Sequence, residues 1–373
     1  MKIIVSNNEL YQATSKLIGV AQQSSNRVIF YPKDENGFYL AAGNPSNMIA
    51  SVEVIATVTG FDSPVWVESA KLYSFLNAIH ASPNITIINA GKRWKFSIGE
   101  SSFTSNTIVD DSFTLIDLPD VDNPIRIKAN EVANLSRVSM LSAKDRGVYS
   151  GTYMVAVGKH LSCMATDGFQ TGMVWFETDK PFDKRRDYFV PSDSMLHMQK
   201  AINDGSDVYI YEGSHRVHFV SDNYRMICTE IAGKEQYPAD RIADAMRCEL
   251  INGSEYDAGD LIDKLTACSV IKDVDHGNVS RVSMEQGEES LTIVSLDNYT
   301  RMTMHVPIIR SFGDEKLKFD INPRYIQTAT NLLKQLGEVS TIFVHNSEEL
   351  NWVFITANGI NGRFAFAKMH PQG

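Results

Sequence analysis

The sequence lacks the long apolar run that a membrane-spanning helix requires. No stretch approaches the roughly 18 consecutive apolar residues of such a helix, although hydrophobic residues make up 43% of the 373 residues. Residues 1–9 become polar too early for a secretory signal peptide. Charged residues make up 21%, which is typical of a soluble globular protein. We therefore expect a cytoplasmic protein without a membrane partner.

Cysteines and catalytic motifs are also sparse. The four cysteines, Cys163, Cys228, Cys248 and Cys268, lie far apart, with no C-x-x-C pair and no histidine at metal-ligand spacing. We expect buried, reduced thiols, no metal site and no other cofactor. The phosphate-binding loop and the motifs HExxH, GxSxG and GxGxxG are absent as well. These absences argue against an enzyme with a standard nucleotide, metal or serine-hydrolase site.

An internal repeat organises the chain. A short β-rich run, a polar turn and an amphipathic helix begin near residues 2, 124 and 248, at intervals of about 120 residues. A second copy of the same unit occurs within each third, at residues 65–79, 188–202 and 319–333. We expect six strand–helix–strand units, with strands outnumbering helices. The predicted domains span residues 1–122, 123–246 and 247–373.

The net charge of −10 excludes a surface that attracts nucleic acid all round. The six predicted helices nevertheless hold eleven basic and seven acidic residues, which leaves −14 for the rest of the chain. The six predicted helices span residues 7–27, 69–82, 130–146, 192–203, 257–272 and 323–336. A ring lined by these helices would attract phosphates without reading bases. Ordinary solvated helix faces explain the same count, and the count alone slightly favours them.

Three motifs, in order along the chain, resemble a known family. They are Ala165-Thr166-Asp167-Gly168, the segment GKEQYPADR at 233–241 and the segment FDINPRY at 319–325. Each motif is weak alone, but their joint spacing is similar to that of the bacterial DNA polymerase III β subunit, the β sliding clamp. The resemblance covers the whole chain, including the number and length of its domains.

The resemblance implies an α+β fold with three tandem, pseudo-symmetric clamp domains. Two chains would close head-to-tail into a ring of six domains, with helices inside and sheets outside. Such a ring is a replicative processivity factor without intrinsic catalysis. Its implied partners are double-stranded DNA bound without sequence preference, a second copy of the chain, a DNA polymerase and a clamp loader ATPase.

The resemblance also implies three sets of site residues. Matching positions place a partner-peptide pocket at Tyr149, Thr166, Gly168, Phe169, Gln170, Thr171, Pro238, Ile242, Asn322, Tyr325, Ala367 and Met369. The positions expected to face DNA are Arg27, Arg137, Lys144, Arg146, Lys200 and Lys264. The positions expected at the dimer interface are Lys71, Ile79, Phe103, Val270 and Ile271. Phe103 can equally be read as an ordinary core aromatic residue.

Two departures from the family pattern fall in the implied pocket. The family usually continues Ala-Thr-Asp-Gly with a His-like residue and then Arg-Leu, where this chain has Phe169, Gln170 and Thr171. The family tail usually reads Met-Pro-Met-Arg, where this chain ends in MHPQG at 369–373. The departures suggest a divergent clamp of the kind a phage or plasmid carries, with a pocket that does not accept the standard peptide unchanged.

Two other functional classes remain open from the residues alone. A motif-poor hydrolase would assemble carboxylates from distant segments, with Asp167 as one candidate. A ring-forming structural or assembly protein would share the repeat but would lack DNA in its bore. Neither class explains the three ordered motifs, and a turn-forming Asp-Gly is the better interpretation of Asp167 and Gly168.

Overall fold

The computed structural model describes most of the chain. The described residues are 1–44, 46–79, 83–111, 113–119, 124–143, 147–202, 205–272, 280–297, 299–347 and 350–369. They form α-helices and antiparallel β-sheets, which confirms the predicted α+β class. Contacts group the chain into two compact units, one of residues 1–136 and 193–231, the other of residues 137–192 and 232–373. The three domain boundaries read from the repeat stay a prediction.

The first unit is built on one large antiparallel sheet. Its elements are β1 (Lys2–Ser6), α1 (Asn7–Gln22), β2 (Arg27–Asp34), β3 (Gly37–Asn44), β4 (Met48–Thr59), β5 (Val65–Glu68), α2 (Ser69–Ala78), β6 (Asn84–Asn89), β7 (Arg93–Ile98), β8 (Ser101–Asn106), β9 (Ile108–Val109), β10 (Ile125–Ile127), β13 (Val208–Gly213), β14 (Arg216–Ser221) and β15 (Tyr224–Thr229). The main strand order is β10-β13-β14-β15-β4-β1-β6-β7-β8. The pairing of β15 with β4 joins the first and second thirds of the chain in one sheet.

The second unit contains two sheets. Its elements are η1 (Ser139–Leu141), η2 (Gly147–Ser150), β11 (Gly151–Thr166), β12 (Gln170–Pro191), η3 (Lys234–Gln236), α5 (Ala239–Arg247), β16 (Gly253–Asp257), α6 (Ala258–Cys268), β17 (Val282–Gln286), β18 (Ser290–Leu296), β19 (Arg301–Pro307), β20 (Arg310–Phe312), β21 (Lys318–Ile321), α7 (Pro323–Leu336), β22 (Thr341–Ser347), β23 (Trp352–Thr356) and β24 (Gly362–Ala367). The strand orders are β11-β12-β24-β23-β22-β16-β20 and β19-β18-β17-β21.

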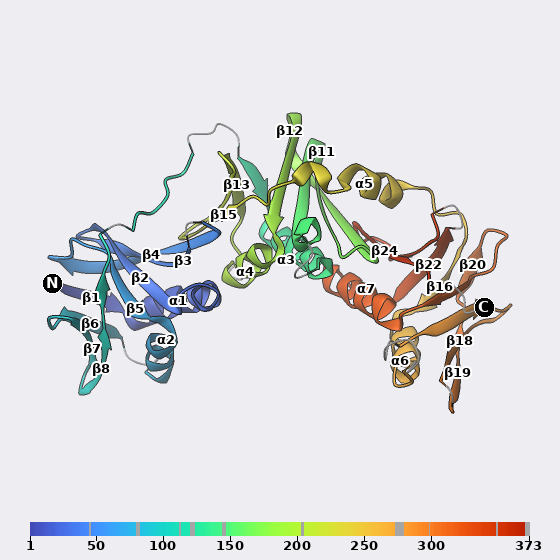
Figure 1. The fold of residues 1–373 in the computed structure, drawn as a ribbon, viewed down its shortest axis with the longest axis horizontal. Coiled ribbons are helices and arrows are strands. Elements are labelled where there is room, and N and C mark those ends of the chain that lie inside the picture. Colours follow the sequence, from blue (N-terminus) through green and yellow to red (C-terminus); the bar gives the residue numbers. More distant parts are fainter. Residues whose placement is uncertain are drawn as a thin grey trace. The chain divides into compact units, whose positions relative to one another are not determined.

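Two helices run across the division between the units, α3 (Ala129–Val138) and α4 (Ser192–Ala201). In the first unit, α1 packs beside α2, and Gln23 Nε2 donates to Asp193 Oδ2 of α4 at 3.4 Å. Ser136 Oγ of α3 donates to Gln199 Oε1 of α4 at 2.9 Å. In the second unit, α6 packs beside α7. In Figure 1 α1 and α2 lie side by side, as do α6 and α7, whereas α5 lies apart from α6 and α7.

All six predicted strand–helix pairs are present, and their caps explain where the helices begin. Ser6 and Asp257 precede α1 and α6, and each side chain accepts a backbone N–H of the first turn. Asn322 does the same for α7, which starts with a proline. Most helices end earlier than predicted; after α3, for example, the apolar spacing continues to Leu141, which lies in the 3₁₀ turn η1.

The helix α5 was not predicted, although its sequence carries a signal for it. Ile242 and Met246 lie four residues apart and are both buried, which is the spacing of an apolar helix face. The 233–241 motif overlaps the start of this helix, and only the spacing of Ile242 and Met246 beyond it indicates the helical period. The strands β11 and β12 are also much longer than the predicted short strands.

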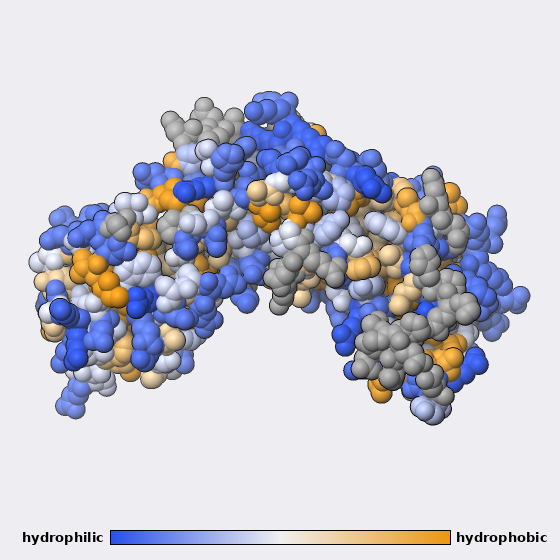
Figure 2. All heavy atoms as spheres, in the orientation of Figure 1, coloured by the Kyte–Doolittle hydropathy of each residue, from blue (hydrophilic) through white to orange (hydrophobic). Residues whose placement is uncertain are grey.

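The surface is mainly hydrophilic on the face drawn in Figure 2, where apolar side chains show as small, separate groups. Within the described residues, no helix combines the length and apolar character needed to cross a membrane. The apolar side chains instead fill the cores, where Trp94, Tyr188, Tyr224 and Tyr256 are among the largest fully buried residues.

Two buried histidines should make the fold sensitive to acid. Burial lowers the pKa of His218 to about 4, with Arg225 and Arg216 adding to the effect. Burial likewise lowers the pKa of His345 to about 4, with a contribution from Arg363. Between pH 6.5 and about 4 the unfolded chain therefore binds more protons than the folded one, and stability falls as the pH falls.

We predict that replacing His218 with Gln flattens the acid side of the stability profile. The wild-type melting temperature should drop by several degrees between pH 6.5 and about 4, and His218→Gln should lose part of that drop. His160→Gln, on an exposed stretch of β11, is the control. Thermal denaturation followed by circular dichroism checks this, and parallel pH profiles for wild type and His218→Gln would contradict it.

Candidate functional site

The tight turn between β11 and β12 is held by a carboxylate. Asp167 Oδ1 accepts the backbone N–H groups of Phe169 and Gln170 at 2.8 and 2.9 Å. Asp167 Oδ2 accepts Gln170 Nε2 at 3.0 Å. Gly168 has φ +95°, a conformation that favours glycine. This geometry agrees with the turn-forming interpretation of Asp167 and Gly168.

Two threonine hydroxyls close the base of the same turn. Thr166 Oγ1 donates to the Gln170 carbonyl at 2.7 Å and accepts the Gly168 N–H at 3.0 Å. Thr171 Oγ1 donates to Thr166 Oγ1 at 2.8 Å. Both threonines are buried, whereas the Phe169 side chain is 54% exposed. The turn therefore exposes the Phe169 side chain to solvent, while the hydroxyls of Thr166 and Thr171 form hydrogen bonds below it.

The last strand of the chain brings a second group of predicted pocket residues to this turn. Strand β24 pairs with β12 so that Gln170 lies opposite Phe366, and the Ala367 N–H donates to the Phe169 carbonyl at 2.9 Å. Tyr325 of α7 stacks on Phe366, with ring centroids 5.6 Å apart and an interplanar angle of 11°. Strand β24 and helix α7, from the C-terminal part of the second unit, thus lie beside the β11–β12 turn from its N-terminal part.

The remaining predicted pocket residues flank this group. Asn322 Oδ1 caps α7 by accepting the Arg324 N–H at 3.0 Å. The Met369 N–H donates to the Asp320 carbonyl at 2.9 Å. Tyr149 lies on η2, where its carbonyl accepts an N–H at 2.9 Å.

Helix α5 carries Pro238 and Ile242 to the same region, because it packs against β11, β12 and β24. The Ile242 N–H donates to the Pro238 carbonyl at 3.0 Å, and the Ile242 side chain is buried. Just before α5, Tyr237 stacks on Tyr153 of β11, with centroids 5.1 Å apart and an angle of 11°. Burial raises the pKa of Tyr237, so its phenol stays protonated.

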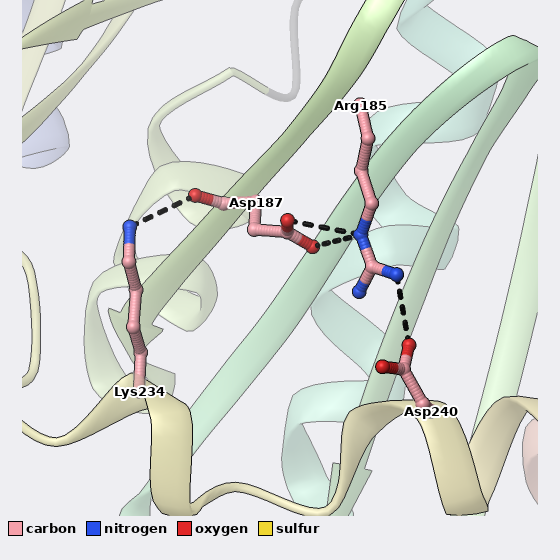
Figure 3. Close-up of polar contacts among 4 residues, drawn as sticks. All are labelled: Arg185, Asp187, Lys234 and Asp240. Atoms are coloured by element: carbon pink, nitrogen blue, oxygen red, sulfur yellow. Dashed lines mark hydrogen bonds and ion pairs between the residues drawn. The ribbon is translucent and has the colours of Figure 1, made fainter.

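A charged cluster that the sequence did not reveal fastens α5 to β12 (Figure 3). The Arg185 guanidinium bonds both carboxylate oxygens of Asp187 at 2.9 Å and Asp240 Oδ1 at 2.9 Å. Lys234 Nζ donates to the Asp187 carbonyl at 3.3 Å. Asp187, and then Asp240, raise the pKa of Arg185 above its usual value. Arg185 and Asp187 lie two residues apart on one strand, but no spacing rule links them to Lys234 and Asp240, about 50 residues later.

The residues predicted to face DNA divide between the two units. Arg27 and Lys200 lie in the first unit, and Arg137 and Lys264 in the second. Arg137 donates to the Gln335 carbonyl at the end of α7, and partial burial lowers its pKa. Lys264 pairs with Asp260 on its own helix at 3.7 Å. Lys144 and Arg146 lie outside the described residues.

The positive surplus of the helices is smaller than predicted. At their observed bounds the six helices hold seven basic and five acidic residues, a net of +2 rather than +4. The predicted ranges included Arg27 and Lys272, which lie outside the helices, and Lys144 and Arg146, which lie outside the described residues. The helix faces are therefore only weakly positive.

The structure brings Lys71 and Phe103, predicted for the dimer interface, together with Arg27. All three line one hollow of about 600 Å³ in the first unit. Phe103 lies on β8, the last strand of its sheet, and stacks on Phe75 with centroids 5.4 Å apart. It is half-buried, so it belongs both to the local core and to the sheet edge.

The other predicted interface residues differ in exposure. The Ile79 carbonyl accepts Asn7 Nδ2 at 2.6 Å, just after α2. Val270 is 75% exposed, whereas Ile271 is only 6% exposed. Ile271 therefore contributes to the core of the second unit more than to its surface.

Comparisons with known proteins agree with the motifs. Residues 126–239 match the family model of the DNA polymerase III β subunit, central domain. The solved structures of the DNA polymerase III β subunits from Pseudomonas aeruginosa and Thermotoga maritima both match with a TM-score of 0.87, at 14% and 16% identity. The DNA polymerase sliding clamp from Bacillus subtilis matches with a TM-score of 0.86 at 16% identity. Each match covers 100% of both chains. A comparison with curated protein sequences gave no match.

The chain therefore has the fold of a DNA sliding clamp over its whole length. More particularly, its central part carries the signature of the DNA polymerase III β subunit, which confirms the resemblance seen in the sequence motifs. The low identities agree with a divergent member.

We predict that replacing Arg185 with Met loosens α5 without unfolding the chain. Exposed ion pairs contribute roughly 0.2–1 kcal/mol each, so the loss of two should speed amide hydrogen exchange in 239–247 several-fold. Arg186→Met is the matched control, because it removes the same charge at the next position along the strand, where Arg186 lies over the Phe182 ring. Exchange measured by mass spectrometry that is equally slow in Arg185→Met and Arg186→Met would contradict the fastening role.

Proposed function

We propose that this chain is a DNA sliding clamp, a processivity factor that encircles duplex DNA and tethers a DNA polymerase to it. The observation that carries the proposal is the full-length match to clamp structures, combined with the central-domain family match. Two chains, each with domains at 1–122, 123–246 and 247–373, would close head-to-tail into a six-domain ring. A head-to-tail contact gives a closed ring when its rotation closes and an open filament when it does not.

The proposed role is cytoplasmic and without intrinsic catalysis. Asp167, the strongest candidate for a catalytic carboxylate, has both oxygens engaged by N–H groups of its own turn. A motif-poor hydrolase or a structural ring protein would not account for the central-domain family match. A clamp loader ATPase would have to open the ring, since the chain lacks a phosphate-binding loop of its own.

The bore is proposed to attract duplex DNA weakly and without sequence preference. The candidate DNA-facing residues are Arg27, Arg137, Lys144, Arg146, Lys200 and Lys264. A weak surplus of positive charge suits a protein that must slide along DNA. Each additional phosphate contact releases counterions and so raises the ionic affinity for DNA. Strong retention would come from encirclement rather than from ionic contacts.

The polymerase and other partners are proposed to dock a linear peptide beside the β11–β12 turn. The geometry that supports this is the meeting of Phe169, Tyr325 and Ala367, with Ile242 of α5 packed against the same strands. Exposed Phe169 offers an aromatic anchor. Gln170 and Thr171 replace a cation and a leucine of the family pattern, so the accepted peptide should differ from the usual one.

Ring closure is proposed to use two sheet edges. Among the described strands, β8 pairs only with β7, and β19 pairs only with β18. An edge strand presents unpaired N–H and carbonyl groups that can accept another strand. Phe103 lies on the first edge and Lys71 lines the same hollow; Ile79 is proposed for the same surface, and exposed Val270, followed by the buried Ile271, for the opposing one.

The test combines light scattering with negative-stain electron microscopy of the purified chain. We expect a mass of twice 41.6 kDa and a ring with an open centre. Phe103→Asp should give monomers, because a charge would replace a half-buried aromatic ring at the seam. Ile55→Asp, at a site that is 69% exposed in the same unit, should leave the dimer intact. A compact, hole-free monomer of the wild-type chain would overturn the proposal.

A further inference from the structure

A tyrosine stands almost fully in solvent at the turn between β18 and β19. Tyr299 is 97% exposed, and nearby Leu296 is 61% exposed. The turn is well held, because Asp297 Oδ1 accepts the N–H groups of Tyr299 and Thr300 at 2.8 and 2.6 Å. An aromatic side chain has few rotatable bonds, so on a fixed turn it loses little entropy when a partner covers it. Tyr299 is therefore suited to anchor a contact.

The hollow beside Phe103 has the lining that such an anchor needs. Its apolar walls come from Trp66, Phe103 and Ile108, and Ile108 is 49% exposed. Three cationic side chains also line it, those of Arg27, Lys71 and Arg93. Glu68 is the acidic residue of the lining, and it pairs with Lys71 at 2.9 Å. The cationic side chains of the hollow would attract the face of an inserted aromatic ring and also a carboxylate next to it.

The strand directions place these two features opposite one another. The hollow lies at the C-terminal end of β8, because Thr104, Ser105, Asn106 and Ile108 line it. Tyr299 precedes the N-terminal end of β19 by two residues. When two strands pair in antiparallel fashion, the C-terminal end of one meets the N-terminal end of the other. The β8 and β19 edges have six and seven residues, so their lengths also agree.

We propose that Tyr299 of one copy of the chain inserts into the hollow of Trp66, Phe103 and Ile108 in a second copy. The Asp297 carboxylate then lies beside the cations of that hollow. This contact rests on the proposed two-chain ring and adds an anchor to it that lies outside the edge strands. The occupant of the hollow is thus a defined segment of the chain itself.

A head-to-tail ring of two chains has two identical seams, so each substitution acts twice. Truncating a buried aromatic anchor commonly weakens an interface by at least about tenfold. Tyr299→Ala should therefore raise the dimer dissociation constant by about a hundredfold. Tyr209→Ala is the control, since Tyr209 is a 37%-exposed tyrosine on β13 in the first unit.

Cross-linking tests the position of the contact directly. In a Cys248→Ser background, whose remaining three cysteines are buried, the pair Ile108→Cys and Tyr299→Cys should be bridged into a covalent dimer by a short bismaleimide. The pair Ile55→Cys and Tyr299→Cys should not be bridged, because Ile55, although more exposed than Ile108, lies on β4 and does not line the hollow.

The outcomes separate this contact from the ring itself. A wild-type dimer whose dissociation is weakened by Tyr299→Ala, together with the specific cross-link, supports the inserted tyrosine. A wild-type dimer that Tyr299→Ala leaves unchanged overturns the inserted tyrosine and leaves the ring standing, whatever the cross-link shows. A wild-type chain that stays monomeric overturns both.

Discussion

The constraint on which the rest of this structure depends is that backbone N–H and carbonyl groups at a sheet edge need partners. Within each unit the antiparallel ladders satisfy the strands, and the long sheet continues from β10 to β8 through the pairing of β15 with β4. Among the described strands, β8 and β19 are left with one paired side each. In the proposed two-chain ring these two edges would pair with each other, near Phe103, Lys71 and the 97%-exposed Tyr299, whereas the sheet ends at β10, β11, β20 and β21 would keep one paired side each.

Much of the fold could be predicted from the sequence, because its signals are local. Ser6, Asp257 and Asn322 cap helices as their residue types suggest, and the apolar spacing after each cap predicts the buried face. The six strand–helix pairs followed from those signals and from the repeat. Helix ends were less predictable, since an apolar residue continues the helical period whether or not the backbone does. That error inflated the positive charge assigned to the helices.

The parts of the site that escaped prediction depend on contacts between distant segments. Asp167 was predicted to form a turn because an Asp-Gly pair has a known local geometry, and its hydrogen bonds agree. The Arg185 cluster joins a pair on one strand, Arg185 and Asp187, to Asp240 of the 233–241 motif, and no local period links the two segments. The stacking of Tyr325 on Phe366 and the hydrogen bond from Ala367 to Phe169 likewise require the sheet order β12-β24. Family resemblance, rather than spacing, predicts Phe169, Tyr325 and Ala367 as members of one pocket.

The central claim is that the chain holds DNA by encircling it, and topology tests this most directly. The protein would be threaded onto a bead-anchored linear duplex, the free end would be capped with streptavidin, and the beads would be washed in high salt. The account predicts retention on capped duplex and release when a restriction enzyme cuts the DNA. Ionic binding alone would be lost in salt with or without the cap. Equal loss from capped and uncapped duplex would contradict encirclement.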